Sequence, residues 1–322
     1  MPKALICKAA GEWQDVLSLQ EVKLPPELST GQVRLKMLTA AIHPSDFGMI
    51  AGTYGKARTF PTVLGREGIG EVIKLGSGAA NLKVGDWVRI PEEVGAWQEQ
   101  VDVPAAELMP LPKNIPVEQL ALSFINPPTV LRVLEDFVKL QPGDIVITNA
   151  GKSAVSVALL QLCKSRSVKA YAVVRNKTTE DVTWLETMGA EGVLDESEEY
   201  FKTTKAALVL NQVGGESVLK LIKALRPGGV CVTIGGATKE LIRYPTRELI
   251  FNDVQLRGFY VTGWFKKHSP EEGRAVMEQI WQLMRKRVVT QEVSAHFKLE
   301  QFAEAFKTVN EPGRRGKVVF VA

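Results

Sequence analysis

The chain has 322 residues, a length that suggests about two domains, each able to bury its own core. Hydrophobic residues make up 45% and charged residues 24%, as in ordinary globular proteins. Forty Lys and Arg against 36 Asp and Glu leave a formal net charge of +4 without any long basic run, which argues against a nucleic-acid partner.

The cysteines and the apolar segments indicate the cellular setting. Cys7, Cys163 and Cys231 lie far apart in apolar stretches, which predicts buried, reduced thiols instead of disulfides. No apolar run approaches the roughly 18–20 residues that span a bilayer, and the first residues resemble a strand more than a signal peptide. We therefore expect a cytoplasmic protein with no membrane partner.

The first 115 residues or so are rich in Gly and Pro and show little helical periodicity. Turn signals separate short strand-like segments at 32–38, 68–76, 85–90 and 97–103. This pattern predicts an all-β, barrel-like domain.

From about residue 116 helical and strand patterns alternate. Helices are expected at 116–124, 129–138, 152–165, 179–188 and 216–225, and strands at 144–149, 168–174, 206–212, 230–236 and 254–262. Apolar strands separated by helices predict an α/β domain with a doubly wound parallel sheet.

The remainder of the chain begins with a long amphipathic helix at 270–287. A strand at 293–299, a helix at 300–309 and a last strand at 316–322 follow, and we expect this last strand to return to the first domain. The resulting division is a catalytic domain at 1–119, a cofactor domain at 120–270 and a return to the catalytic domain at 271–322.

The stretch TNAGKSAVSVALLQ (148–161) forms the first strand-to-helix turn of the α/β domain, where a dinucleotide pyrophosphate usually binds. It contains only one glycine, Gly151, where the G-x-G-x-x-G fingerprint has three. Backbone N–H groups and the Ser153 hydroxyl can cradle phosphate here. An ordinary, unoccupied corner fits the same residues, so the turn alone does not decide.

Arg175 and Lys177 follow the strand 168–174, where an acidic residue would bind the ribose of NAD. A basic residue suits the 2′-phosphate of NADP instead, so this position favours NADP(H) over a merely solvated charge. Glycine pairs at 214–215 and 235–236 add flexible backbone after two later strands.

These residues together resemble the medium-chain dehydrogenase/reductase superfamily, and within it the zinc-free trans-2-enoyl thioester reductases. The similar segments cover nearly the whole chain and include HPSDFGMIAGTYG (43–55), LGREGIGEVIKLGSG (64–78), LNQVGGES (210–217) and LRGFYVTGWFKKHSPE (256–271). The resemblance implies a GroES-like β-barrel catalytic domain, a Rossmann-type domain that binds NADPH, and a homodimer joined edge to edge through 255–263.

The resemblance also assigns site residues. Tyr54 matches a catalytic tyrosine and Trp264 a tryptophan beside the substrate, although a surface loop aromatic and a core anchor are the alternatives from sequence alone. The implied cofactor contacts are Asn126, Gly151, Lys152, Ser153, Ala154, Val155, Arg175, Lys177, Gly235, Gly236, Ala237, Phe259, Tyr260, Val261 and Lys317.

Zinc-dependent members of the superfamily hold a catalytic metal, but the ligand set is incomplete here. His43 lies near the first ligand position, the second is Arg66, and Cys163 belongs to the helix after the phosphate turn. We therefore expect no metal and interpret His43 as a structural cap of a turn.

Without zinc, another group must stabilise and protonate the enolate that forms when hydride reaches the β-carbon of an enoyl thioester. The resemblance implies NADPH as hydride source, Tyr54 as proton donor and a small-molecule acyl thioester as substrate. Two alternatives stay open: an NADPH-dependent quinone or alkenal reductase of the same fold, and a non-catalytic NADPH-binding protein.

Overall fold

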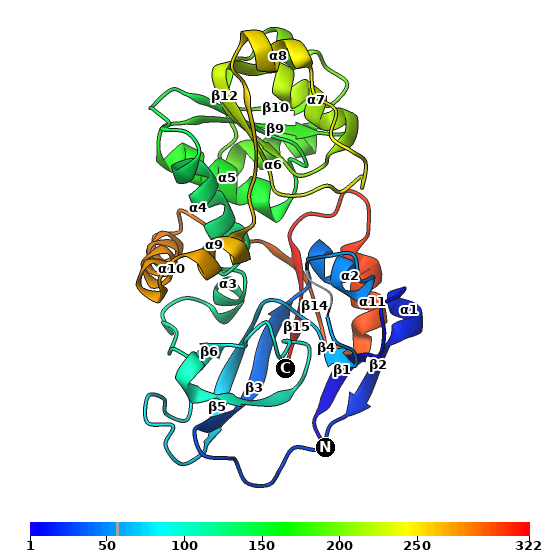
Figure 1. Ribbon diagram of the computed structural model, residues 1–322, viewed down its shortest axis with the longest axis vertical. Helices are drawn as coiled ribbons and strands as arrows, with labels where there is room; N and C mark the ends of the chain where they lie inside the picture. Colours follow the sequence, from blue (N-terminus) through cyan, green and yellow to red (C-terminus); the bar gives the residue numbers. More distant parts are fainter. Residues whose placement is uncertain (56–57) are drawn as a thin grey trace. The chain divides into compact units, whose positions relative to one another are not determined.

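A computed structural model of the chain describes residues 1–55 and 58–322. The chain divides into two compact units, each with its own sheets (Figure 1). The first unit contains Met1–Phe124 and Glu292–Ala322, and the second contains Ile125–Gln291.

The strands of the first unit form two sheets. One has the order β2-β1-β4, and the other has the order β14-β15-β3-β5-β6 with β7 also paired to β3. Their bounds are β1 (Lys3–Cys7), β2 (Leu17–Glu21), β3 (Gln32–Ala41), β4 (Thr62–Val63), β5 (Gly68–Leu75), β6 (Trp87–Arg89), β7 (Gln100–Pro104), β14 (Val293–Phe297) and β15 (Lys317–Val321).

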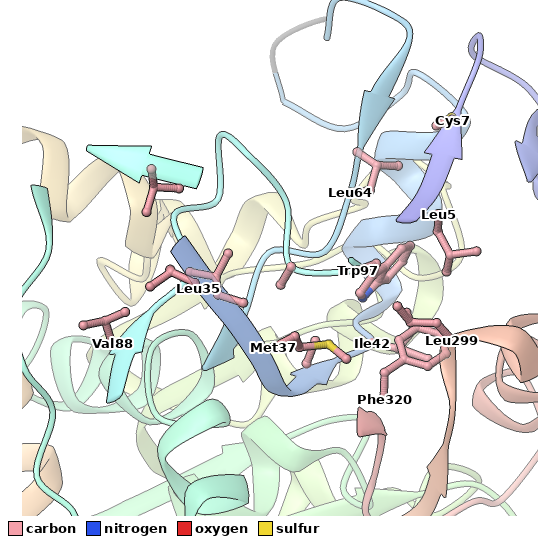
Figure 2. Close-up of a cluster of buried hydrophobic side chains, with 14 of the residues drawn as sticks. Leu5, Cys7, Leu35, Met37, Ile42, Leu64, Val88, Trp97, Leu299 and Phe320 are labelled. Carbon is pink, nitrogen blue, oxygen red and sulfur yellow. The ribbon is translucent and has the colours of Figure 1, made fainter. Parts of the chain in front are cut away.

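Alternation along β3 explains how the larger sheet covers a core. Val33, Leu35 and Met37 are buried on one face, while the residues between them are at least partly exposed, as the two-residue period of a strand requires. Around them Trp97, Phe320 and Leu299 come together in the apolar cluster that Figure 2 shows. The rings of Trp97 and Phe320 meet edge to face with their centroids 5.8 Å apart.

The α-helices in the described part of the first unit are short: α1 (Trp13–Val16), α2 (Pro44–Ile50), α3 (Val117–Ala121) and α11 (Phe302–Val309). The last strand, β15, pairs antiparallel with β3, so that Phe320 lies opposite Ala40. This confirms the expected return of the last strand to the first sheet system.

The second unit is built on one parallel sheet with the strand order β10-β9-β8-β11-β12-β13. This order runs outward in both directions from the first strand, as in dinucleotide-binding domains, and the predicted fold class is confirmed. The bounds are β8 (Ile145–Thr148), β9 (Lys169–Val174), β10 (Gly192–Asp195), β11 (Ala206–Asn211), β12 (Leu225–Thr233) and β13 (Gln255–Gly258).

Helices connect these strands and pack against the sheet (Figure 1). β11 is buried at every position, as expected for a central strand covered on both faces. The helices are α4 (Asn126–Asp136), α5 (Ala154–Ser165), α6 (Thr179–Thr187), α7 (Gly215–Lys223), α8 (Thr246–Phe251), α9 (Val261–Lys267) and α10 (Pro270–Arg285).

Two sequence expectations differ from the structure in this region. The strand expected at 254–262 ends at Gly258, and Val261 begins helix α9. The Phe259 N–H makes the last bond to β12, at Thr233 O, and the next bond is helical, from the Trp264 N–H to Tyr260 O. The return expected at residue 271 occurs at Glu292, because α10 packs its apolar face in the second unit against α4.

Of the helices in the described part of the chain, none has the length and apolar character needed to cross a bilayer.

Candidate active site

Tyr54 is held by a tight turn after helix α2. The N–H groups of Thr53 and Tyr54 both donate to Gly48 O, at 2.8 and 3.1 Å. A Cβ on Gly48 would lie only 2.9 Å from the Tyr54 Cβ, so the glycine lets the tyrosine fold back on the helix. The Gly-flanked stretch thus fixes the tyrosine instead of leaving it in a loose loop.

Arg66 reaches the Tyr54 phenol from the connection between β4 and β5. Its Nη1 donates to the Tyr54 hydroxyl oxygen at 3.1 Å and to Ser45 Oγ at 3.0 Å, and its Nε donates to Glu92 Oε1 at 3.1 Å. The Arg66 side chain is only 3% exposed. Gly65, at φ +101° and directly against the Trp97 ring, sets the direction in which Arg66 leaves the backbone.

The Arg66 guanidinium stays charged in this position. Burial alone would lower its pKa, but the interactions with charged partners, the Glu92 carboxylate first among them, outweigh burial, and the pKa of Arg66 is raised above its usual value. The Tyr54 phenol therefore faces a permanent cation, whose guanidinium carbon lies 5.1 Å from the ring centroid.

A second buried network lies in the same unit. His43 Nε2 is 2.7 Å from Glu67 Oε2, and Lys317 Nζ is 3.2 Å from His43 Nδ1 and 2.8 Å from Ile42 O. Glu67 is fully buried, and its other oxygen accepts from the Phe124 N–H at 2.6 Å. His43 is also the residue before helix α2, where the Asp46 carboxylate accepts from its backbone N–H at 2.7 Å.

The hydrogen-bond donors in this network determine which ring nitrogen of His43 carries a proton. A lysine ammonium can only donate, so Nδ1 accepts and Nε2 carries the proton given to Glu67. Burial, and then the charge of Lys317, lower the pKa of His43, which keeps the imidazole neutral. Burial likewise lowers the pKa of Lys317 to about 8, against the opposing charges of Glu67 and Asp46.

The residues compared with the zinc ligands of related enzymes lie in different surroundings. Within residues 1–55 and 58–322 no group of three or more His, Cys, Asp or Glu side chains could hold a metal ion. His43 and Arg66 take part in the two networks above. Cys163 is buried in α5 of the second unit, where burial raises its pKa to about 12.

In the second unit, most of the side chains that hold the turn after β8 are uncharged. Gln212 connects its parts: its N–H donates to Asn149 Oδ1 at 2.7 Å, its Nε2 donates to Ser156 Oγ at 2.8 Å, and its Oε1 accepts from Ser153 Oγ at 2.9 Å. Ser153 also caps α5 by accepting from the Ser156 N–H. The turn is therefore braced by hydroxyls and amides where the fingerprint has glycines.

Gly151 has a packing role in this turn. Its N–H donates to Val173 O at 2.9 Å, and a Cβ would meet Val173 O and Val174 Cγ1 at 2.9 Å each. The glycine is needed for close approach to β9, and its N–H is directed at Val173. The N–H groups of Ala154 and Val155 belong to the first turn of α5, where helix N–H groups have no intrahelical acceptor and can bind an anion.

The basic residues after β9 differ in their partners. Lys177 Nζ pairs with Glu198 and also reaches Val193 O. Arg175 is exposed directly after the strand, and within the described part of the chain no ion pair engages it. Lys152, also a predicted cofactor residue, is 3.2 Å from Asp181 Oδ2. Arg175 is thus the basic side chain of this corner that remains available to an anion.

The backbone after β12 approaches the same corner. Ala237 N–H donates to Gln212 O at 3.2 Å, and a Cβ on Gly235 would lie 3.0 Å from that oxygen. Gly236 lies between them. Since β8, β11 and β12 are neighbouring parallel strands, their carboxyl ends bring Gly151, Gln212 and Gly235 to one edge of the sheet.

Trp264 lies on helix α9, packed against its own unit. Its ring stacks on His268 with the centroids 3.8 Å apart, and the Arg132 guanidinium carbon is 5.1 Å from its centroid. Of the neighbouring predicted cofactor residues, Phe259 packs edge to face on Phe137, Tyr260 is 47% exposed, and Val261 is buried.

The remaining predicted site residues divide between the units. Asn126 is buried at the start of α4 and belongs to the second unit, which also contains the turn after β8. Tyr54 and Lys317 belong to the first unit.

Sequence reasoning missed Glu67, Glu92 and Gln212. Glu92 stands in an unremarkable stretch. Glu67 lies in the segment LGREGIG beside Arg66, and Gln212 follows an apolar strand beside VGG, so both could have been found by their positions.

Comparisons with known proteins agree with this architecture. The family model described as alcohol dehydrogenase GroES-like domain matches residues 29–113, and the one described as zinc-binding dehydrogenase matches residues 188–320. Mitochondrial enoyl-[acyl-carrier-protein] reductase of Dictyostelium discoideum is 34% identical over 96% of this chain and 91% of its own. The protein of the same name from Rattus norvegicus is 36% identical over 96% of this chain and 86% of its own.

Solved structures extend the comparison. The mitochondrial 2-enoyl thioester reductase Etr1p/Etr2p heterodimer from Candida tropicalis has a TM-score of 0.89 at 26% identity, covering 100% of this chain and 99% of that one. The Etr1p/NADP/crotonyl-CoA complex has a TM-score of 0.89 at 25% identity with the same coverage. A quinone oxidoreductase of Pseudomonas syringae, with a TM-score of 0.86, 20% identity and full coverage of both chains, shares the fold.

Proposed function

Because the chain belongs to the enoyl thioester reductases of the medium-chain dehydrogenase/reductase superfamily, we propose that it reduces trans-2-enoyl thioesters with NADPH, with Tyr54 as the proton donor. The observation that carries the proposal is the fixed position of the Tyr54 phenol. Its oxygen accepts from Arg66, so the phenol's own O–H must point to another acceptor.

The residues of the second unit fit NADPH. The close packing at Gly151, the first-turn amides of Ala154 and Val155, and the exposed Arg175 provide a helix N-terminus for the pyrophosphate and a cation for the 2′-phosphate. When bound, NADPH supplies the hydride that the β-carbon of the substrate accepts. We also propose Asn126, Lys152, Ser153 and Lys177 of this unit as cofactor contacts. Lys317, the other predicted contact, belongs to the first unit and is buried against His43 and Ile42.

Tyr54 completes the addition. Once the β-carbon has gained hydride, the negative charge of the substrate lies on its enolate, and Tyr54 delivers a proton to the α-carbon. The carbon–carbon double bond becomes a single bond, and water restores the proton to the phenol. We assign Trp264, whose ring stacks on His268, to shaping the acyl pocket.

The edge of the second unit's sheet supports a homodimer. All four residues of the edge strand β13 are exposed, and large apolar side chains are exposed near it in sequence, including Ile250 at 66% and Phe251 at 71%. Unpaired strand edges beside apolar surface favour association. We propose that β13 pairs with β13 of a second copy, and light scattering of the purified protein tests this.

We also propose that the protein works in the cytoplasm. Its three cysteines are unpaired and buried, which fits a reducing compartment, although the relatives named above are mitochondrial enzymes. Fractionation of the source cells tests the location.

The test of the activity follows NADPH oxidation with trans-2-hexenoyl-coenzyme A and, separately, with a naphthoquinone. Each substrate is tried with the wild type, with Tyr54→Phe, and with Tyr171→Phe as a control tyrosine from the middle of β9. We expect rapid thioester reduction that falls by about 100-fold or more only in Tyr54→Phe.

Other outcomes separate the alternatives. Quinone reduction that is indifferent to Tyr54→Phe would make the protein a quinone reductase. Tight NADPH binding without turnover of either substrate would make it a non-catalytic NADPH-binding protein.

A further inference from the structure

We propose that Arg66 is a positioning residue that sets the proton-donating strength of Tyr54. This rests on the proposed function, since it concerns the proton that Tyr54 donates. The reasons lie in the hydrogen bonds, the burial and the partners of the guanidinium.

The direction of the Arg66–Tyr54 hydrogen bond is fixed by chemistry. A guanidinium has donors only, so at 3.1 Å the phenolic oxygen must be the acceptor. When the O–H bond of Tyr54 breaks and a C–H bond forms at the substrate α-carbon, the electron pair stays on that oxygen. The acceptor oxygen then carries a negative charge, so the Arg66–Tyr54 contact becomes an ion pair, which is stronger than the bond from the same cation to a neutral phenol.

The rest of the guanidinium is arranged to keep this contact in place. Nε is held by Glu92 and Nη1 also donates to Ser45 Oγ at 3.0 Å, so the planar group is fixed by three different partners. Because the Arg66 side chain is only 3% exposed, water screens its charge weakly. The guanidinium is already in position when the phenolate forms, so the side chain does not have to reorient. A lysine could supply the charge but not this planar fork.

Other charged groups surround the Arg66 guanidinium and its backbone. Glu92 accepts from both Arg66 and Arg58, Asp46 from helix α2 contributes to the charge balance at Arg66, and Arg89 Nη2 donates to the Arg66 carbonyl at 3.4 Å. Removal of Arg66 therefore removes the cation that donates a hydrogen bond to the phenol oxygen at 3.1 Å.

The first measurement does not depend on activity. The near-ultraviolet absorbance of tyrosinate is followed while the pH is raised, and the curve of Tyr54→Phe is subtracted so that one of the five tyrosines is isolated. We expect the Tyr54 phenolate to form at least about one pH unit higher in Arg66→Gln than in the wild type. Equal titration of Tyr54 in both proteins would overturn the inference.

The second measurement uses turnover of trans-2-hexenoyl-coenzyme A. Arg66→Gln should lower kcat by about 10- to 100-fold and move the alkaline limb of its pH profile upward. Adding Arg66→Gln to Tyr54→Phe should cause no further loss, because the two act as one unit. A full additional loss in the double variant would assign Arg66 a role apart from Tyr54.

Controls separate this role from folding. Arg58→Gln removes the other guanidinium that contacts Glu92, without touching Tyr54, and should leave kcat and the titration near wild type. If Arg66→Gln does not fold because Glu92 is left unpaired, Arg66→Gln with Glu92→Gln removes both charges of the pair and is measured in its place. Absence of thioester turnover in the wild type would refute the proposed function, yet the titration would still decide the effect of Arg66.

Discussion

The two units hold their polar groups by different means. The first unit buries charges: Arg66 against Glu92, and Lys317 against the pair of His43 and Glu67. The second unit braces its turn with neutral groups, chiefly Asn149, Gln212 and Ser156, and keeps Arg175 on the surface.

The difference follows from what each unit must stabilise. A buried charge costs much desolvation energy and is retained where a fixed field is useful, as we propose for Arg66 beside the Tyr54 phenol. A dinucleotide brings its own phosphate charges, so its site needs backbone amides and one accessible cation. Neutral hydrogen bonds can shape such a turn at a small cost, provided that each group is satisfied.

The largest effect is expected where a buried charge leaves its partners unsatisfied. Glu67→Leu removes the acceptor of both His43 Nε2 and the Phe124 N–H. We expect the free energy of unfolding in urea to fall by about 3–5 kcal/mol. The exposed control Glu107→Leu should change it by less than about 0.5 kcal/mol. Similar losses in the two variants would mean that the buried network contributes nothing specific to the first unit.

The exposed cation of the second unit should affect binding instead of folding. Arg175→Gln is expected to weaken NADPH binding by about 10- to 100-fold and to leave NADH binding nearly unchanged, because only NADPH carries the 2′-phosphate. Titration calorimetry measures both. Lys169→Gln, at the opposite end of β9, is the matched control. An equal loss of NADPH affinity in that variant would mean that Arg175 acts only through the overall surface charge and does not contact the 2′-phosphate.

The buried lysine predicts a pH dependence that the neutral turn cannot show. Burial lowers the pKa of Lys317 from 10.5 to about 8, so between these values the unfolded chain keeps a proton that the folded chain has lost. Stability should therefore rise with pH across this window, by about 1–3 kcal/mol relative to Lys317→Met. Urea unfolding of both proteins from pH 7 upward, without cofactor, checks the slope; parallel curves would contradict the burial of a charged lysine.

The smallest effect tests the neutral network. Ser156→Ala removes a hydroxyl that lies 3.0 Å from Thr148 Oγ1 and 2.8 Å from Gln212 Nε2. We expect a loss of about 1 kcal/mol in stability, with NADPH affinity within about 3-fold of the wild type, because the hydroxyl braces the turn. Ser165→Ala, at the other end of α5, is the control. A large loss of NADPH affinity would show that Ser156 contacts the cofactor.

Most of the fold could be predicted from local patterns in the sequence. Strand and helix periods depend on neighbouring residues, so the alternation from residue 144 onward predicted the parallel sheet, and Arg175 could be placed after its second strand. The ending of β13 at Gly258 was missed because the apolar run continues through Val261 and only the hydrogen bond to Thr233 shows where pairing stops.

The sequence by itself therefore determined the two kinds of unit, the turn at Gly151 and, through resemblance, Tyr54 as a candidate donor. Only the tertiary structure decided which charges surround that donor. Arg66 lies 12 residues from Tyr54, Glu67 lies 24 from His43, and Lys317 lies 274 from His43. No local periodicity encodes such contacts, because they arise when separate strands and loops close around one core and exclude water from the charges they bring together.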